Sequence, residues 1–320
     1  MCLSLSHINF ISTGKLKKKV FNMQEISKST LKSAIKEVWV RSLTEIQPDV
    51  MEALKKAYEN ETNSRGKQYL EILIQNAQKA GELRMVMCQD TGVPTFFVKT
   101  PLDFPYRDSI REAFDDALRE LTQGEFPMRP MVVHPITRED RGDNTALNVP
   151  LIHAELDNSI DYMEIKAMPK GAGCGTWSTL QIFPPTVGMV GVKKFVVDSV
   201  IRAGSNPCPP IIVGVGIGGP LEEVARLATE ATARPINIHN SDPVVAELEQ
   251  ELLDALNMSQ IGPMGVGGDT TALAVNIECS GTHRPWMPVA VNINCWPGRK
   301  AACRIYRDGR VEQMIAGGAE

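Results

Sequence analysis

Apolar residues recur at helical spacing in the first third of the chain. Leu31, Ile35 and Val38 fall three or four positions apart, which places them on one face of a helix. Pro48 stands where a second helix can begin, because proline is favoured in the first helical turn. Residues 24–83 are therefore predicted to be helical, with short connections between the helices.

The pattern changes after Met85, where short runs rich in β-branched and aromatic residues alternate with amphipathic stretches. The amphipathic stretches predict helices, and the runs rich in β-branched and aromatic residues predict strands. The predicted helices cover residues 107–121, 190–203, 221–233 and 244–256. The predicted strands are TFFVK, MVVH, LIHAELD, DYMEIKAM, IIV, TTALAVNIE and MPVAVNINC, and a hairpin turns at Asp308-Gly309. Without a strict βαβ rhythm, the pattern predicts an α+β fold: a helical N-terminal third followed by mixed β-sheets with surrounding helices.

Residues 1–23 differ from the rest of the chain. They contain no Asp or Glu, and the basic run KLKKK follows their apolar part, the reverse of the order in a secretory signal. This predicts a disordered extension or a mis-assigned start, with Met23 as the true first residue. An organellar targeting peptide is the less favoured alternative, because Lys replaces the usual Arg. Residues 24–320 are predicted to form a single domain, since no internal repeat or low-complexity linker divides them.

The composition is that of a globular protein, with 43% hydrophobic and 22% charged residues. A net charge of −4 gives no indication of binding to nucleic acid or to an anionic membrane, and no apolar run is long enough to cross a bilayer. The seven cysteines are scattered and odd in number, which favours a reducing compartment over a disulfide framework. We therefore expect a cytoplasmic protein whose thiols are free to bind a metal.

One glycine motif has the form of a nucleotide-binding loop. Gly214, Gly216 and Gly219 match the pattern G-x-G-x-x-G between a predicted strand and a helix, as in dinucleotide-binding proteins. However, the strand is short, Pro220 follows the last glycine at once, and no succession of βαβ units surrounds the motif. The glycines are better explained by a close approach of the backbone to another segment, so dinucleotide binding is kept as a distant alternative.

Three of the cysteines stand where regular structure must stop. Cys88 opens the run CQDTG, Cys208 is enclosed by prolines, and Cys295 is followed by WPG. The chain has no C-x₂₋₄-C pair, the usual mark of a zinc site. Three isolated thiolates suit a four-iron cluster with one iron free of protein ligands. On spacing alone, three ordinary buried cysteines are the favoured explanation.

Polar residues close to these cysteines are further candidates. Asp90 lies two positions after Cys88, too near to face away from a site there. Arg129 could offer a two-pronged donor to a carboxylate, and His283 stands in the segment GTHRP, ahead of the strand that ends at Cys295. A lone histidine or a loop arginine is more often structural or solvated, so these residues gain weight only if the segments come together.

Five motifs occur in one order over residues 87–299: MCQDTG, KGAG, PCPPIIVGVGIGG, GVGGDTTALAVNIE and NCWPGR. Together they resemble the α subunit of the class I, iron–sulfur-dependent fumarate hydratases and L-tartrate dehydratases, which corresponds to the N-terminal domain of the single-chain class I fumarases. The likeness covers the chain from about residue 25 to its end. Several long motifs in one order are more specific than any single motif, so the resemblance reverses the preference for ordinary cysteines.

The resemblance implies a [4Fe–4S] cluster whose fourth iron binds substrate. The cluster ligands that it implies are Cys88, Cys208 and Cys295. It implies an acid pair, Asp90 and His283, that handles the proton of the leaving hydroxyl. The groups that it implies for binding substrate carboxylates are Gln89, Arg129 and the amide of Gly173. In the family the base for the carbon proton belongs to a β subunit, so we expect an α2β2 heteromer that completes the active site.

The resemblance also implies the reaction, the reversible hydration of a small unsaturated dicarboxylate by a hydro-lyase. Fumarate, hydrated to (S)-malate as in the tricarboxylic acid cycle, is the expected substrate, with L-tartrate and mesaconate as alternatives. Residues 174–176 read Cys-Gly-Thr where fumarase-like members have a Ser-Glu-Asn-type run, and this looks more like the tartrate dehydratases. Lys170, the GVGIGG turn and the CWPGR run favour fumarase. Cys174 is given no ligand role.

Overall fold

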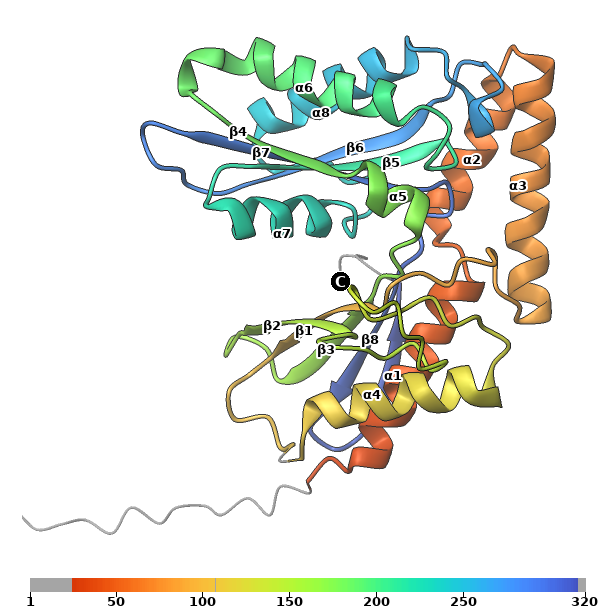
Figure 1. The fold of residues 1–320 in the computed structure, drawn as a ribbon, viewed down its shortest axis with the longest axis vertical. Helices are drawn as coiled ribbons and strands as arrows, with labels where there is room; N and C mark the ends of the chain where they lie inside the picture. Colours follow the sequence, from red (N-terminus) through yellow and green to blue (C-terminus); the bar gives the residue numbers. More distant parts are fainter. Residues whose placement is uncertain (1–24, 107, 316–320) are drawn as a thin grey trace, which may run out of the picture.

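Two β-sheets, one in each half of the molecule, organise the fold (Figure 1). The computed structural model describes residues 25–106 and 108–315, so the predicted extension over residues 1–23 lies outside the described part. One sheet has the strand order β2-β1-β3-β8-β9, and the other has the order β4-β7-β5-β6. We refer to them as the five-stranded and the four-stranded sheet.

The elements follow one another in mixed order along the chain. The helices are α1 (Lys28–Thr44), α2 (Pro48–Asn60), α3 (Ser64–Leu83), α4 (Ile110–Glu120), α5 (Ala172–Trp177), α6 (Gly188–Ala203), α7 (Leu221–Ala231) and α8 (Pro243–Asn257). The strands are β1 (Thr95–Thr100), β2 (Leu151–Leu156), β3 (Tyr162–Ala167), β4 (Thr179–Phe183), β5 (Ile211–Ile217), β6 (Ala272–Cys279), β7 (Met287–Asn294), β8 (Ala301–Tyr306) and β9 (Val311–Met314). Short helical turns cover Leu121–Glu125, Pro185–Val187 and Pro263–Gly265.

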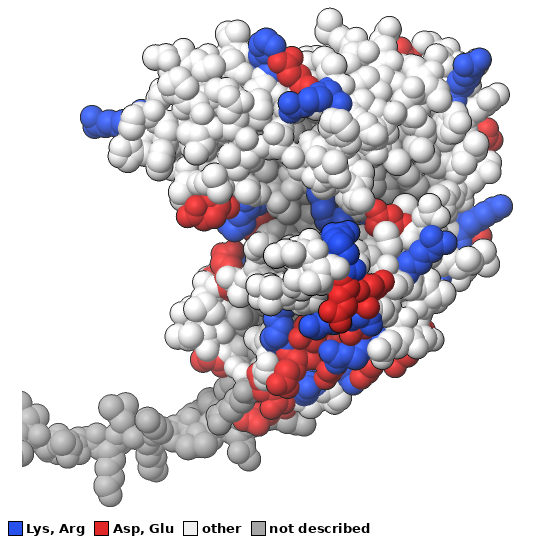
Figure 2. Space-filling view, viewed as in Figure 1, with Lys and Arg blue, Asp and Glu red and all other residues white. Residues whose placement is uncertain are grey.

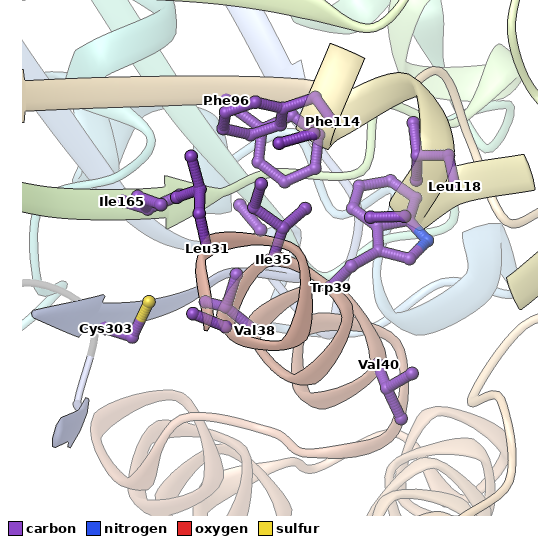
Figure 3. Packing of buried hydrophobic residues seen from close by; sticks show 14 of the residues in the cluster. Leu31, Ile35, Val38, Trp39, Val40, Phe96, Phe114, Leu118, Ile165 and Cys303 are labelled. Atoms are coloured by element: carbon purple, nitrogen blue, oxygen red, sulfur yellow. The ribbon is translucent and has the colours of Figure 1, made fainter. Parts of the chain in front are cut away.

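The five-stranded sheet packs one face against α1 and α4. Trp39 on α1, Phe96 on β1 and Phe114 on α4 meet at the centre of this layer (Figure 3), where the ring of Phe96 lies 5.4 Å from Trp39 and 4.7 Å from Phe114. All three side chains are fully buried. Burying one aromatic side chain removes roughly 150–250 Å² of surface from water, worth about 4–6 kcal/mol before entropy is counted. This layer fixes β1 and β3, which border two of the motif loops.

The four-stranded sheet lies between α6 and α8 on one face and α7 on the other (Figure 1). Its strand β5 is parallel to β6 and antiparallel to β7. Gly214 and Gly216 on β5 lie directly beneath α7, where a Cβ would stand 2.1 Å from Ala228 O and 2.2 Å from Val224 O. Close packing of a helix on the strand therefore explains these glycines, as predicted, without a bound nucleotide.

A separate hydrophobic cluster joins α2 and α3 to the segments that carry the cysteines. Met87 and Trp296 are buried in this cluster, and they are the direct neighbours of Cys88 and Cys295 in the chain. Cys208 packs against the same cluster. The three cysteine segments thus pack against one shared hydrophobic cluster.

The two halves of the molecule differ in surface charge. Charged side chains gather on the half with the five-stranded sheet, whereas the visible face of the other half is mostly uncharged (Figure 2). Ion pairs between α1 and α4 account for part of this, with Lys28 2.9 Å from Asp116 and Lys32 2.7 Å from Glu120. Such exposed pairs add little stability each, about 0–1 kcal/mol.

The predicted α+β class is confirmed, and one predicted strand is wrong. Residues 127–150, which include the run MVVH, are irregular apart from isolated bridges. Pro127, Pro130 and Pro135 interrupt this segment, and proline cannot donate to a strand ladder. The predicted hairpin is confirmed, because β8 and β9 pair around a turn in which Gly309 has φ +85°. Within the part of the chain that is described, no helix has both the length and the hydrophobicity to span a membrane.

Candidate functional site

Loops from three distant parts of the chain meet at the cysteines. The N–H of Trp296 donates to the carbonyl of Cys208 at 3.2 Å, which joins the loops that carry Cys208 and Cys295. Cys208 adopts φ +55°, a left-handed conformation that is uncommon for a residue other than glycine. The N–H of Gly298 turns back to the carbonyl of Cys295 at 2.9 Å, so the second loop is closed on itself.

A hydrogen bond joins the CQDTG segment to the loop of Cys295, because Nη1 of Arg299 donates to the main-chain carbonyl of Asp90 at 2.6 Å. Burial raises the pKa of the Cys208 thiol, and the negative charges of Cys295, Cys88 and Asp90 raise it further. The direct chain neighbours Met87 and Trp296 are buried in the cluster against which Cys208 packs, so the three cysteine segments and Asp90 lie on one side of it.

Asp90 connects two of the motif loops through both of its carboxylate oxygens. Oδ1 accepts the N–H of Gly92 at 2.9 Å, and Oδ2 accepts the N–H of Ala172 at 2.7 Å. Gly92 has φ +78°, and a Cβ there would lie 2.9 Å from the backbone nitrogen of Lys170. The glycine thus permits the tight turn into β1 and the close contact between the CQDTG and KGAG segments.

Two cations, the partly buried Lys170 and the buried Arg299, lie beside the cysteines without an acidic partner among the described residues. Lys170 donates from Nζ to Asn292 Oδ1 and to the carbonyl of Ile293, and burial lowers the pKa of Lys170 to about 8. Arg299 is 3% exposed and donates from Nη1 to the main-chain carbonyl of Asp90 at 2.6 Å. The Nε of Arg299 is buried and has no hydrogen-bond partner in the described part of the chain.

The thiol of Cys174 is also part of this centre. A hydrogen bond from Cys174 lowers the pKa of Cys295, and the positive charges of Arg299 and Lys170 lower it further. The same thiol–thiol hydrogen bond, together with burial, raises the pKa of Cys174. Cys295 is therefore the thiol of this pair that is more readily present as a thiolate, the form that binds metals.

The predicted substrate-binding residues lie on segments next to the cysteine loops. The side chains of Gln89 and Arg129 are exposed. The hydroxyl of Thr91 donates to the carbonyl of Arg129 at 2.7 Å, which holds this arginine beside the CQDTG segment. Gly173 packs against the loop before Cys208, where a Cβ would lie 2.5 Å from the backbone oxygen of Asn206.

His283 does not lie with the other predicted residues. It is exposed in the loop between β6 and β7, with its ring 5.4 Å from that of Trp286. The 8 residues of β7 separate this loop from Cys295. At about 3.3 Å per residue, the start of β7 lies roughly 26 Å from Cys295, and His283 lies in the loop beyond that end. The predicted pair of Asp90 and His283 is therefore not formed within one chain.

A large cleft between the two halves of the molecule is a separate feature (Figure 2). It has a volume of about 590 Å³ and is lined by residues of β1, β2 and α7. Its basic side chains have acidic partners, among them Arg226 with Glu230 and Arg234 with Glu278. These two arginines are therefore already paired and less available to a dicarboxylate. At the cysteine site, by contrast, Lys170 and Arg299 have no acidic partner among the described residues.

The residues at the cysteine site fit an iron–sulfur cluster. Within the described residues, no group of three His, Cys, Asp or Glu side chains is arranged to hold a single metal ion. A cluster is wider than one ion and requires thiols that are further apart. Cluster irons prefer thiolate ligands, and the positive charges of Lys170 and Arg299 beside these thiols would offset the added negative charge. The unsatisfied Nε of Arg299 also leaves one donor available to a sulfur.

Sequence reasoning gave Lys170 and Arg299 no role in the site. Both stand inside the quoted motifs, at the start of KGAG and at the end of NCWPGR. Their significance depends on the lack of a carboxylate partner, which only the three-dimensional arrangement shows.

Comparison with known proteins gives a consistent result. The family model described as fumarate hydratase (fumerase) matches residues 32–304. A Methanocaldococcus jannaschii protein, named provisionally as an L(+)-tartrate dehydratase subunit alpha, is 42% identical over 266 residues, or 82% of this chain and 93% of the relative. The L(+)-tartrate dehydratase subunit alpha of Escherichia coli K12 is 34% identical over 271 residues, or 85% of this chain and 89% of the relative.

Proposed function

Because this chain belongs to the fumarate hydratase family, a family of hydro-lyases, we propose that it is the α subunit of a [4Fe–4S] enzyme that reversibly hydrates a small unsaturated dicarboxylate. The observation that carries the proposal is the convergence of three cysteine loops on Asp90 and on two cations, Lys170 and Arg299, that have no acidic partner in the described part of the chain. A set of solvated or unrelated cysteines would not require buried, unpaired positive charge around it.

Cys88, Cys208 and Cys295 would hold the cluster, in agreement with the ligands expected from the resemblance. When bound, such a cluster supplies a Lewis-acidic iron that polarises the carbon–oxygen bond of a 2-hydroxy acid. The cluster carries net negative charge, because three thiolates outweigh the charge of its core. Lys170 and Arg299 would offset this charge and allow it to be buried.

Asp90 is proposed to handle the proton of the leaving or attacking hydroxyl. Its carboxylate is held in place by the N–H groups of Gly92 and Ala172, one on each oxygen. Each oxygen keeps the capacity to accept a further hydrogen bond. A carboxylate fixed in this way can receive or return a proton without first reorienting, which favours general acid–base catalysis.

Gln89, Arg129 and the amide of Gly173 are proposed to bind the substrate carboxylates. The guanidinium of Arg129 is exposed, and a planar fork of N–H donors matches the geometry of a carboxylate. Exposed side chains beside a buried metal centre are suited to select an anionic substrate as it enters. The carboxylates would be held while Asp90 exchanges the proton.

The active site is proposed to need further chains. His283 stands too far from Asp90 to act in its own chain, so it remains a candidate only for the site of another copy. The base for the carbon proton is proposed to come from a β subunit, in an α2β2 assembly. The relatives support this, since both are named as alpha subunits. The free cysteines and the expected sensitivity of the cluster to oxygen favour a cytoplasmic enzyme.

Fumarate, hydrated to (S)-malate, is the first substrate to test. L-tartrate is the second candidate, because the names of both relatives specify L(+)-tartrate dehydratase. The Cys-Gly-Thr run over 174–176 also supports L-tartrate, because it looks more like the tartrate dehydratases than the Ser-Glu-Asn-type run of fumarases; it lies in α5. Mesaconate, a methylated fumarate, is the third.

The test is anaerobic purification of the chain together with its β subunit, followed by assay of fumarate, L-tartrate and mesaconate. We expect a brown protein whose visible absorption is bleached by air. Cys208→Ser should abolish the absorption, and the matched control Cys279→Ser, on an exposed thiol at the end of β6, should retain it. A colourless, iron-free protein after anaerobic reconstitution would overturn the cluster. Full activity of this chain alone would overturn the split active site.

A further inference from the structure

Arg299 stands at the end of the NCWPGR motif and reaches two further motif loops. Its Nη1 donates to the main-chain carbonyl of Asp90 in the CQDTG segment. A Cβ on Gly171, in the KGAG segment, would lie 3.3 Å from its Nη2. Arg299 follows directly after Gly298, whose N–H closes the loop of Cys295 by donating to the Cys295 carbonyl at 2.9 Å. No sequence argument assigned it a function.

The hydrogen bonding of Arg299 is incomplete for a buried guanidinium. The side chain is 3% exposed, and its Nε has no partner among the described residues. Arg234 offers a useful comparison, because its Nε is also buried and unpartnered, yet its guanidinium pairs with Glu249 and Glu278. Arg299 makes no such ion pair among the described residues, and a buried guanidinium with an unfilled donor is costly, so a further negative group is expected to complete its site.

We propose that Arg299 is a positioning residue that couples Asp90 to the cluster, by holding the Asp90 main chain and by presenting its charge and its free Nε–H to the sulfur atoms. This rests on the proposed function, since the cluster is the negative group. Loss of the Arg299 side chain would release the Asp90 loop on one side and remove a donor and a positive charge from the cluster on the other. Both the proton transfer and the electronic state of the cluster would change together.

The cluster's reduction potential distinguishes this role from a purely structural one. Hydrogen bonds to cluster sulfurs and nearby positive charge both make reduction easier, so they raise the potential. Arg299→Gln removes the charge and should lower the midpoint potential most. Arg299→Lys retains the charge but loses the planar fork, so it should lower the potential less. The order expected is wild type, then Arg299→Lys, then Arg299→Gln.

The experiment uses the full chain with its β subunit, reconstituted anaerobically with ferrous iron and sulfide. Electron paramagnetic resonance during a redox titration measures the midpoint potential, and steady-state assays separate kcat from KM. We expect kcat to fall by about 10- to 100-fold with KM little changed, because Asp90 would be misplaced while the carboxylate-binding groups remain. Arg234→Lys is the matched control, expected to lower the melting temperature without altering the potential.

Each result decides the inference. An iron-loaded Arg299→Gln protein with the wild-type potential and kcat would overturn it. If Arg299→Gln does not assemble a cluster, Arg299→Lys, which keeps the charge, is measured instead. An iron-loaded Arg299→Lys protein with the wild-type potential and kcat would then overturn the inference. An equal shift of potential in Arg234→Lys would show a general effect of lost buried arginine and would also overturn it. A wild-type protein without iron would overturn the proposed function first, whereas iron-loaded variants that match wild type overturn this inference alone.

Discussion

Replacing Gly173 by alanine tests whether contact with α5 locks the loop that carries Cys208. A Cβ at Gly173 would lie 2.5 Å from Asn206 O, whereas ordinary contact begins near 3.4 Å. The two backbones must therefore separate by roughly 0.9 Å, and overpacking of this kind costs about 1–3 kcal/mol. We expect the free energy of unfolding to fall by that amount. Asn206 stands two residues before Cys208, so the same displacement should move a proposed cluster ligand.

Gly175→Ala is the matched control in the same helix. A Cβ there would meet only Lys170 Cγ, at 4.0 Å, and alanine stabilises a helix by about 0.5–1 kcal/mol relative to glycine. Urea unfolding of the iron-free chains measures stability, and anaerobic reconstitution measures bound iron. We expect Gly173→Ala to be less stable and to bind less iron, and Gly175→Ala to match or exceed wild type in stability. Equal stability and iron content in the two variants would refute the reasoning.

Four further predictions follow from the same geometry. Asp90→Asn should retain iron but lower kcat by about 10²- to 10⁴-fold, as measured in steady-state assays, because the group that exchanges the proton is lost. Mixing Asp90→Asn chains with His283→Asn chains should restore activity if the two groups act from different copies; no recovery would remove His283 from the account. Burial lowers the pKa of Lys300 to about 8 from its ordinary value of 10.5, so the unfolded chain binds more protons between these values and stability rises with pH through this range. Lys300→Met should flatten that rise by up to about 3 kcal/mol in urea titrations, and an unchanged slope would contradict the shift. Gly214→Ala should destabilise the fold, because its Cβ would stand 2.1 Å from Ala228 O, while NAD should not raise the melting temperature of the wild-type chain.

Elements with a clear period were predictable from the sequence, and their arrangement was not. The run TFFVK became β1, and the stretch predicted over 244–256 became α8 with nearly the same bounds. Strand partners depend on contacts between distant segments, so no local pattern indicated that β1 pairs with β2 in parallel and with β3 in antiparallel fashion. The strand predicted at MVVH was wrong because the prediction gave more weight to its β-branched residues than to the prolines around it, which prevent a strand ladder.

Candidate site residues could be proposed from the sequence where the residue type itself indicates the chemistry, as with cysteine. They could not be proposed where the indication is a buried donor that lacks a hydrogen-bond partner. Cys88, Cys208 and Cys295 were selected by the ordered motifs that resemble a known family, since their spacing alone favoured ordinary buried cysteines. The importance of Arg299 arises from an unsatisfied donor in a buried place, which has no signature in the sequence. The position of His283, at the far end of β7 from Cys295, likewise follows from strand length and direction only once the strand is built.

The most direct test of the account is the Mössbauer spectrum of the chain reconstituted anaerobically with ⁵⁷Fe, recorded together with its β subunit before and after addition of a dicarboxylate substrate. Three thiolates on a four-iron cluster leave one iron without a protein ligand. The account predicts that the signal of this one iron shifts when substrate is added, while the signals of the other irons stay in place. A protein that binds no iron, or a cluster spectrum that substrate leaves unchanged, would contradict it.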